Sequence, residues 1–60
     1  MSEHLLPRKE VELRVGLKRS AIYDRISRGD FPEPVRFRGT RAVRWRASAI
    51  DAWLENQILD

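Results

Sequence analysis

The segment that most restricts the fold is VRFRGTRAVRW at residues 35–45, in which apolar and basic side chains alternate. A period of two is the pattern of a strand with one face turned to a core. Val35, Phe37, Val43 and Trp45 fall on one face, and arginines fall on the other. We therefore expect a basic β-hairpin that packs its apolar face against the rest of a small domain.

The loop of this hairpin sets its register. A three-residue loop over residues 39–41 keeps the apolar face intact, whereas a two-residue turn at 39–40 mixes the two faces. We therefore predict the three-residue loop, although a five-residue loop over 38–42 gives the same register and stays open. The predicted pairs are Phe37 with Val43 and Val35 with Trp45.

The predicted register also sets Arg36 opposite Arg44. Directly opposed like charges destabilise a sheet. A bound phosphate would relieve that repulsion, so we interpret the pair as a functional feature. The alternative is two flexible side chains that diverge into water.

Two short helices are predicted before the hairpin. The first covers roughly residues 8–15, follows Pro7, buries Val11 and Val15, and stops at Gly16. The second lies within KRSAIYDRISRG, residues 18–29, with Ile22 and Ile26 facing inward and Gly29 as its cap. Two short helices joined by a tight turn with glycine are typical of a helix-turn-helix, and the second helix would be its recognition helix, called the reading helix below.

A last helix is predicted in RASAIDAWLENQILD, residues 46–60. Ser48 and Asp51 resemble a capping box, although the helix could begin a residue or two earlier. Ile50, Trp53 and Leu54 form its apolar stripe, to which Ile58 could add. Both tryptophans are expected in the core, and the acidic outer side should point away from nucleic acid.

Composition excludes several classes of protein. The chain has 60 residues, no cysteine and one histidine, so disulfides and a histidine or cysteine metal site are not expected. His4 is expected to be inert. There is no nucleotide-binding motif and no room for a large cleft, so we expect no catalysis and no cofactor. With no apolar run near 18 residues and no signal-peptide pattern, we expect a soluble cytoplasmic protein.

The positive charge is concentrated in the middle of the chain. Residues 1–17 are neutral, residues 18–46 carry nine basic and three acidic side chains for a net +6, and residues 47–60 carry −3. Eight of the nine basic residues are arginine, the side chain best suited to phosphate and guanine contacts. This uneven distribution of charge predicts a polyanionic partner. The alternative is a basic surface that is only solvated.

Three stretches resemble one known family. They are EVELRVGLKRSAIYDRI, GDFPEPVRF and RAVRWRASAIDAWL, which together span most of residues 5–56. They are similar to the AlpA-type prophage regulators, relatives of phage excisionases and of the winged domains of MerR-like proteins. The resemblance implies a single α+β, mostly α domain over residues 1–60, a winged helix-turn-helix with frayed ends near 1–4 and 57–60. It also implies DNA binding in transcriptional control or prophage excision. Lys18 departs from the family, which usually has Ser or Thr there, and we expect it to contact phosphate.

The candidate DNA-contacting residues lie on the second helix and the wing. On the reading helix they are Lys18, Arg19, Ser20, Tyr23, Asp24, Ser27 and Arg28. On the wing they are Arg36, Arg38, Thr40, Arg41 and Arg44. Several have alternatives: Tyr23 can belong to the core, Asp24 can accept from cytosine or pair with Arg25 or Arg28, and Arg46 can contact DNA, stack on a ring or cap a helix. Gly39 is expected to serve the turn.

The expected partner is double-stranded DNA. One reading helix contacts few base pairs, so we expect a homodimer or a cooperative oligomer on DNA. The alternative function is a protein-interaction module that docks an integrase or another recombination partner. RNA is a weaker third candidate because no exposed aromatic platform is predicted.

Overall fold

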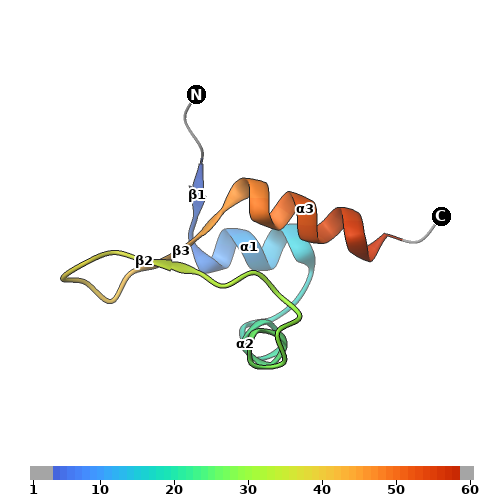
Figure 1. The fold of residues 1–60 in the computed structure, drawn as a ribbon, viewed down its shortest axis with the longest axis horizontal. Helices are drawn as coiled ribbons and strands as arrows, with labels where there is room; N and C mark the ends of the chain where they lie inside the picture. The colour runs from blue at the N-terminus through green and yellow to red at the C-terminus, as the bar shows by residue number, and fades with distance from the viewer. Residues whose placement is uncertain (1–3, 59–60) are drawn as a thin grey trace.

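The computed structural model describes residues 4–58, which form three helices and a three-stranded antiparallel sheet. In chain order the elements are β1 (Leu5–Leu6), α1 (Arg8–Val15), α2 (Arg19–Ser27), β2 (Val35–Arg36), β3 (Val43–Arg46) and α3 (Ala47–Gln57). Figure 1 shows α1 and α3 running side by side across the view and α2 seen end-on below them. The α+β, mostly α winged helix-turn-helix predicted from the sequence is confirmed.

Both predicted glycines end their helices. The N–H of Gly16 donates to the carbonyl of Glu12 at 2.8 Å, which closes α1. After α2, the N–H of Gly29 donates to Ile26 and the N–H of Asp30 donates to Arg25, at 3.0 and 2.8 Å. This paired pattern is a Schellman motif, and Gly29 supplies its left-handed residue with φ 75°.

A short strand at the N-terminal end was missed from the sequence. β3 lies in the centre of the sheet, and β1 pairs with it through Leu6 and Trp45. Two residues are too few to show a period, so no pattern predicts β1. The pairing of β1 with β3 also explains how α3 begins. The N–H of Ala47, the first helical residue, donates to the carbonyl of His4 at 2.9 Å.

The capping box at Ser48 and Asp51 was therefore wrong. α3 starts one residue before Ser48, its N-cap is Arg46, and that side chain makes no capping hydrogen bond. The alternative that α3 begins a residue or two earlier is confirmed. A backbone carbonyl from β1 satisfies a helix N–H that a side-chain cap would otherwise serve.

The predicted register of the wing was also wrong. By the wing we mean β2, β3 and the loop at residues 37–42. The structure pairs Val35 with Arg44 and Arg36 with Val43, one position away from the prediction. Arg36 and Arg44 are thus not opposite each other, and the repulsion that we interpreted as a phosphate site does not exist. Leu6, rather than Val35, lies opposite Trp45.

Residues 37–42 form a loop between the paired residues Arg36 and Val43, and this loop contains a tight turn. Thr40 donates its N–H to the carbonyl of Phe37 at 3.3 Å, and Gly39 between them has φ 78°. Within residues 4–58 only glycines have positive φ, so Arg38 has negative φ and the turn is type II. The wing tip projects away from the helices (Figure 1), so burial against the core does not fix the register near the tip.

The core lies between the sheet and the helices. Its buried residues are Leu6, Val11, Ile22, Phe31, Trp45 and Ile50. The inward stripes predicted for the helices are confirmed, with Trp53 half-buried beside them. Phe31, between α2 and β2, was missed because it belongs to no periodic segment. Ile58 is 64% exposed, so it lies outside the core.

The chain ends lie partly outside the described residues. Of the ends predicted to fray, residues 1–3 and 59–60 are not described. His4 accepts the backbone hydrogen bond from Ala47, and Ile58 donates its N–H to Leu54 at 3.2 Å.

Candidate nucleic-acid interface

The outer face of α2 and the residue before it carry the predicted reading residues. Lys18, Arg19, Ser20, Asp24, Ser27 and Arg28 are exposed. Tyr23 is half-buried and packs edge-on against Trp45, with ring centroids 6.3 Å apart. Tyr23 therefore lies at the boundary between the core and the outer face of α2.

The N-terminal end of α2 is held against the core through aromatic contacts. The guanidinium of Arg19 lies 6.0 Å from the centroid of the Tyr23 ring, which in turn contacts Trp45. Lys18 forms the N-cap without a side-chain capping bond, so its ammonium group is not used to start the helix. Unpaired backbone N–H groups at such an end favour anions. Lys18, Arg19 and Ser20 therefore stand at the end of α2 where its backbone favours an anion.

Three predicted reading residues interact with one another. Arg28 forms an ion pair with Asp24 at 3.0 Å, as the sequence alternative predicted. The Ser27 hydroxyl donates to the Asp24 carbonyl at 2.7 Å. Because both side chains of the ion pair are more than half exposed, water screens the pair. Asp24 and Arg28 thus lie side by side at the outer face in a weak, solvent-exposed pair.

Arg25, also on α2, has a structural position instead. It pairs with Asp30 at 2.8 Å and lies 5.6 Å over the Trp53 ring. The indole of Trp53 donates to the Asp30 carbonyl at 2.9 Å and packs against Phe31 with centroids 4.8 Å apart. This cluster joins the end of α2 to α3 and so fixes the direction in which the outer face points.

The wing carries three exposed arginines, Arg36, Arg38 and Arg41, which form no ion pair within residues 4–58. Arg44 differs from them: it is half-buried, and its Nη1 donates to the Val43 carbonyl at 2.8 Å.

Thr40 has a structural position at the wing tip. Its hydroxyl donates to the Phe37 carbonyl at 3.3 Å and accepts from the Ala42 N–H at 3.1 Å. The hydroxyl therefore shapes the turn that presents the arginines on either side of it.

Trp45 connects the wing to the reading helix. It is completely buried, its indole donates to the Pro32 carbonyl at 2.9 Å, and its ring contacts Tyr23 on α2. Both aspartates of the basic segment are paired with arginines of α2. Six other cations of this segment have no ion-pair partner in the described part of the chain, namely Lys18, Arg19, Arg36, Arg38, Arg41 and Arg44.

Arg46 lies at the junction of β3 and α3. It is exposed and forms the N-cap of α3 without a side-chain capping bond. Its backbone belongs to the central strand, opposite Leu5.

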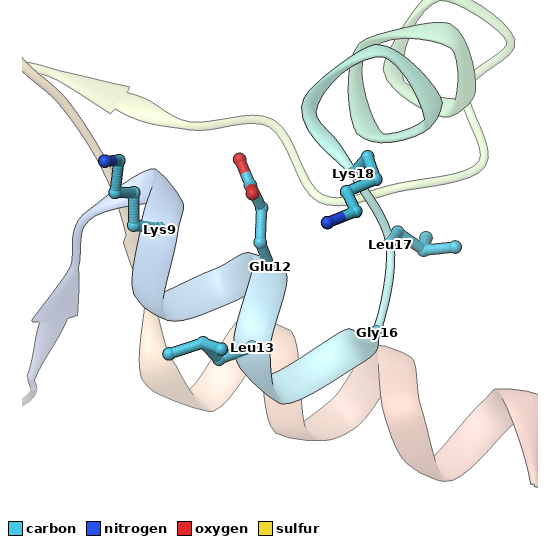
Figure 2. Close-up of a pocket in the computed structure, with 6 residues that line it drawn as sticks. All are labelled: Lys9, Glu12, Leu13, Gly16, Leu17 and Lys18. Atoms are coloured by element: carbon cyan, nitrogen blue, oxygen red, sulfur yellow. The ribbon is translucent and has the colours of Figure 1, made fainter.

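A hollow of about 490 Å³ lies between α1 and the turn into α2. Figure 2 shows its lining, in which charged side chains accompany apolar ones. The lining residues are Lys9, Glu12, Leu13, Gly16, Leu17 and Lys18. Leu13 is 81% exposed. It lies two positions from both Val11 and Val15, roughly 200° around the helix, so its exposure follows from helical spacing. No motif in the sequence predicts this hollow, which is formed only when α1 and the turn into α2 come together.

The described residues offer neither a metal site nor a membrane-spanning helix. Among residues 4–58, no three His, Cys, Asp or Glu side chains gather as they would around a metal ion. In the same part of the chain, every helix is too short or too polar to span a bilayer.

Known proteins resemble this chain along nearly its full length. The family of the prophage CP4-57 regulatory protein, AlpA, matches residues 4–58. A protein of Enterobacteria phage P4, ORF88, is 39% identical over 56 residues, which cover 93% of this chain. The chain spans 62% of the length of that phage protein.

Proposed function

The chain belongs to the AlpA family of prophage regulatory proteins, and from this premise we propose that it is a sequence-specific regulator that binds double-stranded DNA. The observation that carries the proposal is the placement of cations. Six basic side chains without an ion-pair partner within residues 4–58 lie around α2 and along the wing. Such a surface attracts phosphates along a duplex.

In this proposal α2 enters the major groove. The nearest side chains to the bases are Ser20, Asp24 and Arg28, all exposed on its outer face. Arg28 lies beside Asp24, and an arginine guanidinium suits bidentate contact with guanine. Lys18 and Arg19 contact phosphate near the start of the helix, and Tyr23 and Ser27 support this face through their packing and hydrogen bond.

The wing contacts the neighbouring backbone and minor groove. Arg38 and Arg41 flank the type II turn and would follow phosphates on either side. Arg36 and Arg44 would contact the backbone closer to the sheet. Thr40 acts through the turn that its hydroxyl holds, which changes the direct contact expected from the sequence.

We place this activity in the cytoplasm, in control of prophage genes. The protein would act in excision by controlling integrase expression or by bending attachment-site DNA, and it would bind as a homodimer or a cooperative oligomer. We expect it to catalyse no reaction and to need no cofactor. These statements follow from the family and from the small reach of one reading helix.

Selection of bound duplexes from a random DNA library tests the proposal. We expect enrichment of repeated or inverted half-sites. Substitution of Ser20 or Asp24 by alanine should change the preferred sequence, whereas Arg41→Ala should weaken binding to all duplexes alike. A library without enrichment would contradict sequence-specific binding, and equal effects of all three variants would contradict the division between α2 and the wing.

A second candidate function is docking of a protein such as an integrase. The hollow with the exposed Leu13 favours it, because an apolar side chain beside charged ones is typical of a contact surface. Leu13→Asp separates the two functions. If docking is the primary function, this variant loses the protein partner while duplex selection yields no enriched sequence.

A further inference from the structure

Phe37 is a large apolar side chain in the most basic part of the wing. The sequence predicted it in the core, but it is 43% exposed and does not belong to the hydrophobic cluster formed by the described residues. Arg36 and Arg38 precede and follow it, and neither has an ion-pair partner within residues 4–58. A partly exposed aromatic ring thus belongs to the same short stretch of the wing as two cations that have no ion-pair partner in the described part of the chain.

The backbone at Phe37 is held in place by the tip turn. Its carbonyl accepts both the N–H and the hydroxyl of Thr40 at 3.3 Å, and Thr40 also accepts the N–H of Ala42. Three hydrogen bonds therefore fix the backbone that carries the ring and the neighbouring arginines. A group that is ordered before binding loses less conformational entropy when it binds.

Exposure alone does not make an apolar residue functional, because single exposed apolar side chains are common. Leu13 is more exposed than Phe37 but lies on α1, off the wing. What distinguishes Phe37 is its setting. The minor groove has two phosphate rims with sugars and base edges between them, and apolar side chains inserted there accompany arginines on the rims.

We propose that Phe37 is an apolar minor-groove contact, with its ring packed against sugars and base edges while Arg38 and Arg41 contact the phosphates. This inference rests on the proposed DNA-binding function. It assigns the wing two separable contributions: one electrostatic and dependent on salt, the other apolar and independent of salt.

The test measures the affinity of the full chain for a duplex from the library selection across a range of salt concentrations. Phe37→Ala should weaken binding about tenfold at every salt concentration, by analogy with other ring–base contacts. The slope of log affinity against log salt should stay unchanged. Arg41→Ala should instead reduce that slope by about 0.9, since one phosphate contact is lost. Phe37→Leu should keep most of the affinity because leucine is also an apolar wedge.

Ile58→Ala is the matched control, since Ile58 is 64% exposed, directly follows α3 and lies off the wing, so its truncation should leave affinity unchanged. Far-UV circular dichroism verifies that each variant folds. The inference is overturned if Phe37→Ala binds like the wild type, if it reduces the salt slope as Arg41→Ala does, or if Phe37→Leu is as weak as Phe37→Ala. If the wild type itself binds no duplex in a salt-dependent way, the proposed function fails, and this inference fails with it.

Discussion

Replacing Trp45 by phenylalanine should remove much of the stability of the domain. Trp45 is completely buried in the central strand, and its indole N–H donates to the Pro32 carbonyl at 2.9 Å. Phenylalanine keeps an aromatic ring but has no donor and a smaller volume. The variant therefore measures how much the hydrogen bond and the close fit of the ring add to stability beyond the burial of an apolar aromatic side chain.

The expected loss follows from two contributions. A partly buried carbonyl that loses its partner costs about 1–3 kcal/mol, and the smaller ring adds roughly 1 kcal/mol for lost contacts and a residual cavity. The sum is about 2–4 kcal/mol. A domain of this length has a free energy of unfolding of about 3–9 kcal/mol, so the loss is a large fraction of the total and at the lower end of that range unfolds the variant at room temperature.

Urea denaturation followed by far-UV circular dichroism measures the loss. Trp53→Phe is the matched control, because its indole donates to the carbonyl of the exposed Asp30, where water can replace it. We expect that control to lose less than about 1.5 kcal/mol. A loss below about 1 kcal/mol for Trp45→Phe, or equal losses for both tryptophans, would refute the reasoning.

Three further predictions concern charge and backbone. The double variant Arg38→Ala, Arg41→Ala should reduce the salt slope of duplex binding by about 1.8; the control Arg8→Ala, Arg14→Ala removes two cations that are ion-paired on α1, and equal slopes in both would contradict a wing contact. Gly29→Ala should lower the free energy of unfolding by about 1–2 kcal/mol, since φ is 75° there; an unchanged urea midpoint would argue against the Schellman motif. Arg25→Ala should cost under about 1 kcal/mol and leave the salt slope unchanged, since its partners Asp30 and Trp53 are structural; a reduced slope would place Arg25 at the DNA.

The helices could be predicted well because their signals are local. Val11 with Val15 marks the inward face of α1 by spacing, and Ile22 with Ile26 marks that of α2. A glycine follows each of these two helices closely. The pairing of Asp24 with Arg28 was one of two local alternatives, and it too depends only on helical spacing.

The sheet could be predicted only in part because its register depends on contacts far apart in the chain. The alternation of residues 35–45 predicted the hairpin, but it treated Phe37 as a core residue. Between Arg36 and Val43 the wing lies away from the core, so burial does not select the register there. β1 and the start of α3 depend on each other through His4 and Ala47, a contact that no local pattern contains.

The candidate interface shows the same division. Exposure of α2 followed from its periodicity, whereas the turn-forming position of Thr40 and the structural position of Arg25 required the three-dimensional contacts. Both residues are of types that bind phosphate elsewhere, and composition alone cannot distinguish a cation paired in the structure from an unpaired one.

The most direct test of the central claim compares two duplexes of equal length and base composition, one from the library selection and one with its sequence scrambled. Affinity for each is measured across salt concentrations. The account predicts that both bind with steep salt dependence and that the selected duplex binds at least about a thousandfold more tightly at physiological salt. Equal affinities for the two duplexes would contradict a sequence-reading role for α2, and binding that is insensitive to salt would contradict DNA recognition by the basic surface as a whole.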